Sequence, residues 1–419
     1  MSIDQQRLGR KGKWSGTEYP RILSTVCASV KRKSRALIAA SRSKNECHNP
    51  VKAPQPPSLT HTRYRQIQPK NIHPQDALYL RPIPMPTQSR EVRLASRPSG
   101  VPTLDNFSFA TVSLPDPNPG EVLVRNLCIS VDPYMRGRMN EAKSYVPPFQ
   151  VGQPLEGGAV GRVVASRDEK LPVGTFVQSI YGWREAFVAP ASKLQIVDTT
   201  VAPPSTYLGI LGITGFTAWV GLFRIARLKE GETVFVSGAA GAVGSAVCQM
   251  AKMHGCRVIA SAGSQDKLAV LRNDLKVDYA FNYRDGEPLA HLKQAAPDGI
   301  HVYFDNTGGP QLDAALAVLR NFGRVAMCGA IAGYNTPVPG PRNLATAIGK
   351  RLRLEGFIVS DHFKEMPAFL AEAIPALQSG KLSSRETVVE GLDAAPAAFL
   401  DLLHPGAGNT GKMIVNLPG

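Results

Sequence analysis

The sequence predicts an α/β protein that combines a doubly wound parallel sheet with a second, β-rich region. From residue 208 onward, helical patterns alternate with strand-like runs, the order that crossover helices and a parallel sheet produce. Before that point, apolar runs meet at Gly and Pro, which indicates a β-rich region. The expected strands lie first at 90–95, 121–130, 157–165, 176–180 and 186–188, and then at 233–236, 258–260, 279–282, 301–305, 324–328 and 352–359. We expect a helix over 363–380 and a last strand over 411–417 that returns to the β-rich region.

The most informative stretch is Thr233–Gly244, TVFVSGAAGAVG. A strand of β-branched and aromatic residues meets a glycine turn, and a helix and a second strand follow within about 30 residues, as in a dinucleotide-binding unit. Gly241 would let the backbone approach a pyrophosphate, and Gly244 would let the helix pack closely on the sheet. Ala239 stands where the usual motif has its first glycine. The alternative is a glycine turn in an α/β unit that binds no nucleotide, and the strand–helix–strand context favours the nucleotide site.

The end of the second strand indicates which nucleotide is bound. NAD-binding units usually carry an acidic residue there, which holds the ribose 2′-hydroxyl. This chain has Ser261–Ser264 at that point, and its first acid is Asp266. Small hydroxyl residues and the cation of Lys267 would attract a 2′-phosphate, which favours NADP(H). Lys267 could equally be a solvated lysine in the first turn of the next helix.

Composition excludes several classes of function. The chain has 419 residues, 43% of them hydrophobic, and a net charge of +15. Residues 1–84 hold 16 Lys/Arg against 4 Asp/Glu, and the remainder holds 32 against 29. The basic charge therefore belongs to the first 84 residues and does not indicate nucleic-acid binding by the folded part. No run approaches 18 apolar residues, so we expect no membrane span. The six cysteines form no CxxC pair, which is typical of a reduced intracellular protein without disulfides or a cysteine zinc site.

The basic segment 1–84 is predicted to be a disordered extension, because it is rich in Ser, Arg, Lys, Gln and Pro and poor in aromatic residues. Its arginine-rich, acid-poor composition also fits an organelle-targeting segment, which would imply a mitochondrial enzyme. A third interpretation is that the working protein begins at Met85, where ordered-looking sequence starts. We favour this last interpretation and a cytoplasmic location.

Seven further motifs occur in one order along the chain: VDPYMRGRM (131–139), VGQPLEGGAVGRVV (151–164), GAAGAVGSAV (238–247), YFDNTGG (303–309), CGAIAGYN (328–335), GPRN (340–343) and GNTGKMIV (408–415). Together they resemble the zinc-independent medium-chain dehydrogenase/reductases, in the branch of prostaglandin reductases and alkenal or curcumin double-bond reductases. The resemblance covers Met85–Gly419. It implies a GroES-like β-rich catalytic domain over 85–210, a Rossmann NADP-binding domain over 211–359, and a C-terminal segment over 360–419 that returns to the catalytic domain.

Zinc-dependent relatives of this family carry Gly-His-Glu where this chain has Leu155-Glu156-Gly157, and they carry a four-cysteine lobe that is missing here. Zinc needs three or four converging ligands. The candidate histidines have no partner motif and are interpreted as surface or packing residues: His254, His291, His301 and His362. We therefore expect no metal.

The resemblance implies that NADPH delivers hydride to the β-carbon of an α,β-unsaturated aldehyde or ketone. The resulting enolate oxygen needs preorganised donors. By resemblance, Tyr334 is the phenol that hydrogen-bonds the enolate, with help from the cofactor's ribose hydroxyl. Tyr134 is a second candidate that shapes the substrate side. Tyr334 could also be an ordinary loop aromatic, and Arg136 could equally be structural.

The resemblance also implies the cofactor contacts. Gly241, Ala242, Val243 and Gly244 would hold the pyrophosphate, and Lys267 and Tyr283 would meet the 2′-phosphate and its ribose. Asn306 would meet the ribose or the nicotinamide side, and Asn409 would reach the nicotinamide from the C-terminal segment. The backbone of two segments would line the nicotinamide, with Cys328, Gly329, Ala330 and Tyr334 in one and Phe357, Ile358 and Val359 in the other. Asn306 and Asn409 stand beside glycines, where Asn is also an ordinary turn residue. Cys328 ends an apolar strand with no histidine near it in sequence, so we interpret it as a packing residue and not as a nucleophile.

The leading function is an NADPH-dependent enal or enone reductase acting on a small molecule, and by resemblance a homodimer without nucleic-acid or membrane partners. The alternative enzyme is a quinone or carbonyl reductase on the same scaffold. A third possibility is a cofactor-holding protein without catalysis, against which Tyr334 and the intact CGAIAGYN loop argue.

Overall fold

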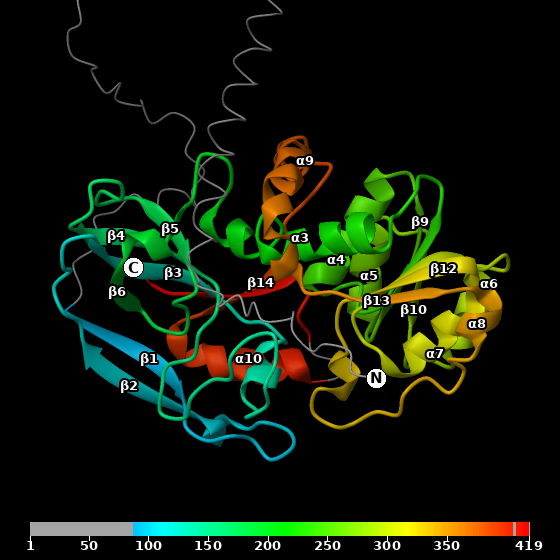
Figure 1. The fold of residues 1–419 in the computed structure, drawn as a ribbon, viewed down its shortest axis with the longest axis horizontal. Helices are drawn as coiled ribbons and strands as arrows, with labels where there is room; N and C mark the ends of the chain where they lie inside the picture. The colour runs from blue at the N-terminus through cyan, green and yellow to red at the C-terminus, as the bar shows by residue number, and fades with distance from the viewer. Residues whose placement is uncertain (1–86, 405–407, 419) are drawn as a thin grey trace, which may run out of the picture. The chain divides into compact units, whose positions relative to one another are not determined.

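The computed structural model describes residues 87–404 and 408–418. These residues belong to one compact unit. The expectations for residues 1–84, including the disordered extension, lie outside the described residues. Figure 1 shows the chain as two sheets joined by helices and by its C-terminal strand.

A six-stranded parallel sheet forms the nucleotide-binding half, as predicted. Its apolar strands are buried on both faces, which is typical of a parallel sheet covered by helices. The order places the first strand of the glycine-rich unit in the centre, so the chain winds outward in both directions. The strands in spatial order are β10 (Tyr279–Asn282), β9 (Arg257–Ala262), β8 (Thr233–Val236), β11 (Ile300–Asp305), β12 (Leu319–Met327) and β13 (Arg353–Gly356).

Helices cover both faces of this sheet (Figure 1). α3 (Ile213–Val220) packs on α4 (Ala242–Met253), and α6 (Pro288–Ala295) packs on α7 (Gly309–Val318). The remaining two are α5 (Gln265–Asn273) and α8 (Thr346–Lys350). The helix expected near 208–222 is broken into pieces: a 3-10 turn ends at Leu208, α3 follows, and a π turn occupies Gly221–Ile225.

The β-rich half is a seven-stranded sheet. The long strand β3 (Glu121–Ser130) lies at its centre and pairs antiparallel with β4 (Ala159–Ser166), β6 (Ala186–Pro190) and β15 (Lys412–Asn416). The pairing of β15 with β3 confirms that the last strand returns to this half. The other strands are β5 (Phe176–Ser179), β7 (Gln195–Ile196) and β14 (Glu386–Glu390), and a separate pair is formed by β1 (Gln88–Leu94) and β2 (Phe107–Ser113).

The segment after residue 360 serves both halves. α9 (Met366–Gln378) packs on α3, where Trp219 contacts Phe369 and donates a 3.0 Å hydrogen bond to Glu372. α10 (Ala395–Leu403) instead contributes Phe399 to the core of the β-rich half, edge-on to the buried Trp183. A short helix, α2 (Met135–Arg138), lies over the same core.

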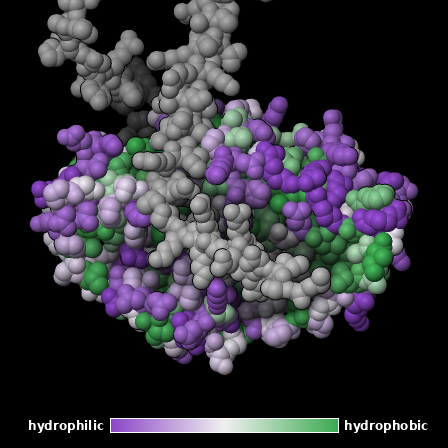
Figure 2. All heavy atoms as spheres, viewed as in Figure 1, coloured by the Kyte–Doolittle hydropathy of each residue, from purple (hydrophilic) through white to green (hydrophobic). Residues whose placement is uncertain are grey.

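Exposed apolar side chains lie in and before α8, the helix that precedes the last strand of the parallel sheet. β13 pairs only with β12 and so ends the sheet. Figure 2 shows apolar surface where Figure 1 places α8. Ile348 in this helix is 81% exposed, and Leu344 just before it is 50% exposed.

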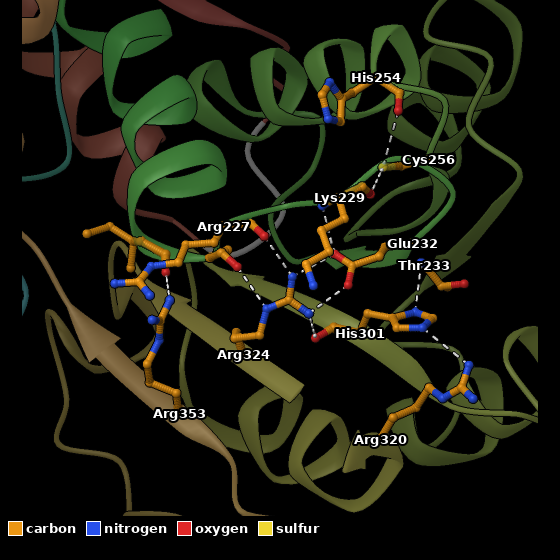
Figure 3. A network of polar contacts seen from close by, with 12 residues as sticks. Arg227, Lys229, Glu232, Thr233, His254, Cys256, His301, Arg320, Arg324 and Arg353 are labelled. Atoms are coloured by element: carbon orange, nitrogen blue, oxygen red, sulfur yellow. Dashed lines mark hydrogen bonds and ion pairs between the residues drawn. The ribbon is translucent and has the colours of Figure 1, made fainter. Parts of the chain in front are cut away.

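A polar network fixes the amino ends of the parallel strands (Figure 3). Arg324 forms a two-pronged ion pair with Glu232 at 2.6 and 2.9 Å and donates to the carbonyls of Ala226 and Arg227. His301 Nδ1 accepts from the Thr233 N–H at 3.0 Å. Burial opposes ionisation of Glu232, but Arg324 and the Lys229 N–H hold its pKa below the ordinary value. This network does not involve the carboxyl ends of the same strands, where the candidate site lies.

No helix among the described residues is long and apolar enough to cross a membrane.

Candidate active site

A cavity of about 950 Å³ lies at the carboxyl ends of the parallel strands and extends to the β-rich half. Its walls come from the loops after β8, β9, β11 and β12 and from residues beside β3 and β15. Ligands of open α/β sheets bind at this end, where the strand order reverses.

The glycine turn after β8 forms one wall. Gly241 lines the cavity directly before the first residue of α4, and among the described residues a Cβ added to it would meet only the Gly238 carbonyl oxygen, at 3.2 Å. A Cβ on Gly244 would lie 2.3 Å from the Gly238 carbonyl oxygen, so α4 packs as closely as predicted. The turn's left-handed residue is Gly238, with φ of +57°. Ala239 is therefore tolerated in the motif, since it has no positive φ and instead packs fully buried against β9, donating to the Ser261 carbonyl at 3.0 Å.

The first N–H groups of α4 face this cavity without intrahelical acceptors, because a helix leaves its first four donors unpaired. Together with the positive end of the helix dipole, they form a phosphate site. Gly241, Ala242, Val243 and Gly244 all line the cavity at this point, and we call this part of its lining the glycine wall.

A cationic pocket lies where β9 ends. Ser264 caps α5 by accepting from the Lys267 N–H at 3.4 Å, which places Lys267 on the cavity wall. The Lys267 ammonium forms no ion pair with any residue in the described part of the chain. Burial, together with the nearby Arg284 guanidinium, lowers its pKa. The Tyr283 ring lies beside this pocket, with Arg284 5.8 Å from its centroid. The Lys267 cation on the wall and the nearby Arg284 suit a 2′-phosphate, although the Glu287 residue also lines the cavity.

A buried polar cluster ties the ends of β8 and β11 together. The Asp305 carboxylate accepts from the Tyr303 hydroxyl at 2.7 Å and from the Thr307 and Gly308 N–H groups at 2.9 and 2.8 Å. The Asn306 amide donates to the Ser237 carbonyl at 2.7 Å. The turn that carries Asn306 is thereby fixed against the glycine turn, and Asn306 lines the cavity.

Cys328 lines the cavity after β12, and its N–H donates to the Asp305 carbonyl at 2.9 Å. Burial and the neighbouring Asp305 raise the pKa of its thiol to about 12. The thiol therefore stays protonated, which agrees with its interpretation as a packing residue.

Two tyrosines face the cavity from opposite halves. Tyr334 follows a 3-10 turn, Ile331–Gly333, in the loop after β12, and Tyr134 precedes α2. Both pack against the core of the β-rich half. Burial raises the pKa of Tyr334, partly offset by the Ala330 N–H, and burial also raises the pKa of Tyr134. Both phenols therefore remain hydrogen-bond donors at neutral pH.

Sequence reasoning missed part of this wall. Lys412 is 3% exposed, and its ammonium donates to the carbonyls of Val131 and Met413 and pairs with Asp132 at 3.1 Å. Asp132 also accepts from the Ser130 hydroxyl. Asp132 lies in the motif VDPYMRGRM and Lys412 lies in the motif GNTGKMIV, so the sequence analysis had already singled out both segments. Their pairing across 280 residues depends on the contact between β15 and β3.

Packing and an ion pair occupy the Leu155–Glu156 position, where the resemblance led us to compare the chain with zinc-dependent enzymes. Leu155 is buried in the core of the β-rich half, and Glu156 pairs with Arg138 at 2.7 Å. The described residues contain no group of three or more His, Cys, Asp or Glu placed to hold a metal.

The cavity brings together nearly every residue that the sequence singled out. Ala330 is the exception, since it is exposed and absent from the cavity wall. The prediction for Ala330 concerns its backbone, and its N–H lies near the Tyr334 hydroxyl. Those on the wall are Tyr134, Gly241, Ala242, Val243, Gly244, Lys267, Tyr283, Asn306, Cys328, Gly329, Tyr334, Phe357, Ile358, Val359 and Asn409.

Comparison with known proteins shows which protein family has this architecture. A family model described as the N-terminal domain of oxidoreductase matches residues 90–197, and one described as zinc-binding dehydrogenase matches residues 242–374. A tobacco (Nicotiana tabacum) 2-alkenal reductase (NADP(+)-dependent) is 40% identical over 78% of this chain and 97% of its own length. The chain belongs to the medium-chain dehydrogenase/reductase family. Within it, it falls in the branch of NADP-dependent alkenal, curcumin and prostaglandin reductases.

Other members of the family agree. The NADPH-dependent curcumin reductase of Escherichia coli (strain K12) is 37% identical over 79% of this chain and 98% of its own length. The crystal structure of CurA from Vibrio vulnificus matches with a TM-score of 0.74 and 38% identity, over 79% of this chain and all of that one. The same protein is also known in complex with NADPH, at the same TM-score. The protein is therefore an NADP-dependent oxidoreductase of this fold, and the glycine wall and the cationic pocket fit that cofactor.

Proposed function

We propose that this protein uses NADPH to reduce the carbon–carbon double bond of α,β-unsaturated aldehydes and ketones. The observation that carries the proposal is one continuous cavity that contains the glycine wall, the Lys267 pocket and the Tyr334 phenol. Relatives named as a 2-alkenal reductase and a curcumin reductase support the same activity.

NADPH, when bound, supplies the hydride that adds to the β-carbon of the substrate. The chain's own residues bind the cofactor and stabilise the charge that develops on the substrate's carbonyl oxygen. The N–H groups at the start of α4 hold the pyrophosphate, and Lys267 and Tyr283 hold the 2′-phosphate and its ribose. Asn306 and the backbone from Cys328 to Tyr334 orient the nicotinamide side.

Tyr334 donates its hydroxyl proton as a hydrogen bond to the carbonyl oxygen as this oxygen gains negative charge. A donor of this kind is most effective when it is preorganised and shielded from water. Packing against the core supports this role, and so does a raised pKa that keeps the phenol protonated. Tyr134, on the opposite wall, shapes the substrate side.

A substrate panel tests the function. The purified chain is mixed with NADPH and, separately, with 2-alkenals, cyclic and linear enones, quinones and saturated aldehydes. NADPH absorbance reports turnover, and mass spectrometry identifies the product. Conversion of an enal to the saturated aldehyde supports the proposal. Turnover of quinones or saturated aldehydes alone would instead establish the alternative reductase, and binding of NADPH without any turnover would indicate a cofactor-holding protein.

We also propose that the protein is a homodimer. Two features support association of two copies: β13 ends the six-stranded sheet within the described part of the chain, and the apolar residues Leu344 and Ile348 in and before α8 are exposed. The mass of the purified protein in solution, measured by light scattering, decides between monomer and dimer.

We propose in addition that the protein is located in the cytoplasm. The four cysteines that the structure describes are all free, which is typical of a reducing compartment.

A further inference from the structure

Arg136 is a buried cation that has no counter-ion among the residues that the structure describes. Arg136 is 4% exposed, and no carboxylate within the described ranges forms an ion pair with its guanidinium. Burying an unpaired charge is costly, so such a residue needs strong hydrogen bonds to offset the lost hydration. Arg136 has three. Its Nη1 donates to Asn140 Oδ1 at 2.8 Å, its Nη2 to the Gly100 carbonyl at 2.7 Å, and its Nε to Asn335 Oδ1 at 3.0 Å.

The third of these bonds joins the two halves, next in sequence to residues that line the cavity. Arg136 lies in α2, two residues after Tyr134, whereas Asn335 directly follows Tyr334 in the loop after β12. One guanidinium therefore connects the segments that carry the two cavity tyrosines.

Hydrogen bonds hold the Tyr334 loop on two sides, in addition to the packing of the Tyr334 ring against the core of the β-rich half. On the cofactor side, the Ile331 and Ala332 N–H groups donate to the carbonyls of Asn306 and Thr307 at 3.4 and 3.2 Å. On the substrate side, the bond from Arg136 to Asn335 is the anchor. The chain then runs through three prolines, Pro337, Pro339 and Pro341, which have no N–H to donate. Tyr334 is thus fixed between the two anchors.

We propose that Arg136, acting through Asn335, is the positioning residue that holds the Tyr334 hydroxyl at the substrate's carbonyl oxygen. The inference rests on the proposed function of Tyr334. A rigid guanidinium is required because three acceptors in three directions must be reached at once. The lysine ammonium is a compact point charge on a flexible stem and does not reproduce this fork.

The test removes the acceptor and leaves the buried charge in place. In Asn335→Ala, we expect the single-turnover rate of hydride transfer to an enal to fall about tenfold, because small misplacements of a catalytic group are costly. The KM for NADPH should stay unchanged, since the cofactor-side anchors are intact. Asn335→Asp keeps an acceptor and should retain the rate. Arg136→Lys should resemble Asn335→Ala, and the Asn335 variants decide the matter if Arg136→Lys does not fold.

A double-substitution cycle separates positioning from general damage. If the anchor acts through the Tyr334 hydroxyl, Tyr334→Phe costs much less in the Asn335→Ala background than in the wild type. Arg324→Lys is the matched control, because it disturbs a buried arginine with a similar fork at the opposite end of the sheet. It should lower the melting temperature and leave the hydride-transfer rate unchanged.

Three results would overturn the inference: an unchanged rate in Asn335→Ala, losses that simply multiply in the double variant, or an equal rate loss in Arg324→Lys. Failure of the proposed function looks different. In that case the wild-type protein itself reduces no enal, and the inference about Arg136 falls with it.

Discussion

Cofactor choice depends at the residue scale on Lys267. Its ammonium lies on the cavity wall beside Arg284 and has no acid partner in the described part of the chain, so a dianionic phosphate is the partner that its surroundings favour. An acidic residue at the end of β9 would have reversed this preference. Asp266, the first acid after that strand, is exposed and is not part of the wall.

Lys267→Ala should raise the KM for NADPH at least about tenfold, the effect of losing one charge-assisted contact. The KM for NADH should change little, because NADH has no 2′-phosphate. Initial rates with each cofactor measure both values. Lys252→Ala is the control, since Lys252 lies outside the cavity and pairs with Asp278 at 2.9 Å. Equal losses for NADPH and NADH would contradict the phosphate assignment.

Tyr334→Phe removes one hydroxyl and keeps the packing of the ring. We expect kcat to fall by roughly ten- to a thousandfold, as for other donors aimed at developing charge. NADPH affinity should stay nearly constant, because the backbone of the loop is retained. Stopped-flow measurement with deuterated NADPH shows whether hydride transfer is the step observed. An unaltered rate of that step would assign the enolate to another group.

At the scale of elements, the parallel sheet has a structural end and a functional end. The amino ends are fixed by Arg324, Glu232 and His301 (Figure 3), and the carboxyl ends form the cavity. The His301 ring accepts from Thr233 through Nδ1, which requires that nitrogen to be unprotonated. Its Nε2 faces the Arg320 guanidinium at 3.2 Å, a further reason against a second positive charge.

His301 should therefore destabilise the fold in acid. Burial lowers its pKa, and Arg320 and Arg324 lower it further while Glu232 opposes them. The unfolded chain then takes up the proton first, so the stability that neutral His301 contributes is fully present above about pH 6.5. It is lost as the pH falls from there to the lower folded pKa, and it changes no further below that pKa. We expect the melting temperatures of the wild type and of His301→Gln to converge between pH 8 and pH 5. Parallel curves would show that His301 does not titrate in this window.

The local sequence pattern was sufficient to predict most of the strands and helices. It did not predict which side chains from distant parts of the chain contact each other. Strands over 121–130, 233–236 and 279–282 coincide with β3, β8 and β10, because each is a short β-rich run bounded by turn residues. The glycine wall and Lys267 were predictable for the same reason, since they lie within one strand–helix–strand unit. The pairs Asp132–Lys412 and Arg136–Asn335 join residues about 200 or more positions apart, and no local pattern specifies them. β2, β14 and α10 were not among the predicted elements, although α10 buries Ala395, Phe399 and Leu403 at helical spacing.

At the scale of the whole molecule, residues 1–84 are expected to be dispensable. Their charge is one-sided, and their apolar content is too low to offset the entropy of ordering them. A chain shortened to begin at Met85 should have the kcat and melting temperature of the full chain. Loss of cofactor binding or of the folded state in the shortened chain would show that the segment packs on the domain. Intact-mass measurement of the protein from its own cells would reveal an N-terminus within 20–84 if targeting is followed by cleavage.

Gly411 connects the two halves of the molecule. We expect the fold to be sensitive to substitution of this residue. Its N–H donates to the Ala240 carbonyl of the glycine turn at 2.8 Å, and the next residue begins β15 in the other sheet. Its φ is +66°, and a Cβ there would lie 2.0 Å from the Arg385 carbonyl oxygen. Gly411→Ala should therefore lower the free energy of unfolding by about 2 kcal/mol or more, because both strain and a clash with backbone must be relieved.

The displaced turn should also bind cofactor less well, so the KM for NADPH should rise together with the loss of stability in Gly411→Ala. Chemical denaturation and initial rates measure the two effects. Gly340→Ala is the control, since Gly340 has no positive φ and no atom within 4 Å of an added Cβ. A Gly411→Ala protein that is destabilised but binds NADPH normally would mean that the glycine turn keeps its shape without this contact. The C-terminal strand would then stabilise the fold without forming part of the cofactor site.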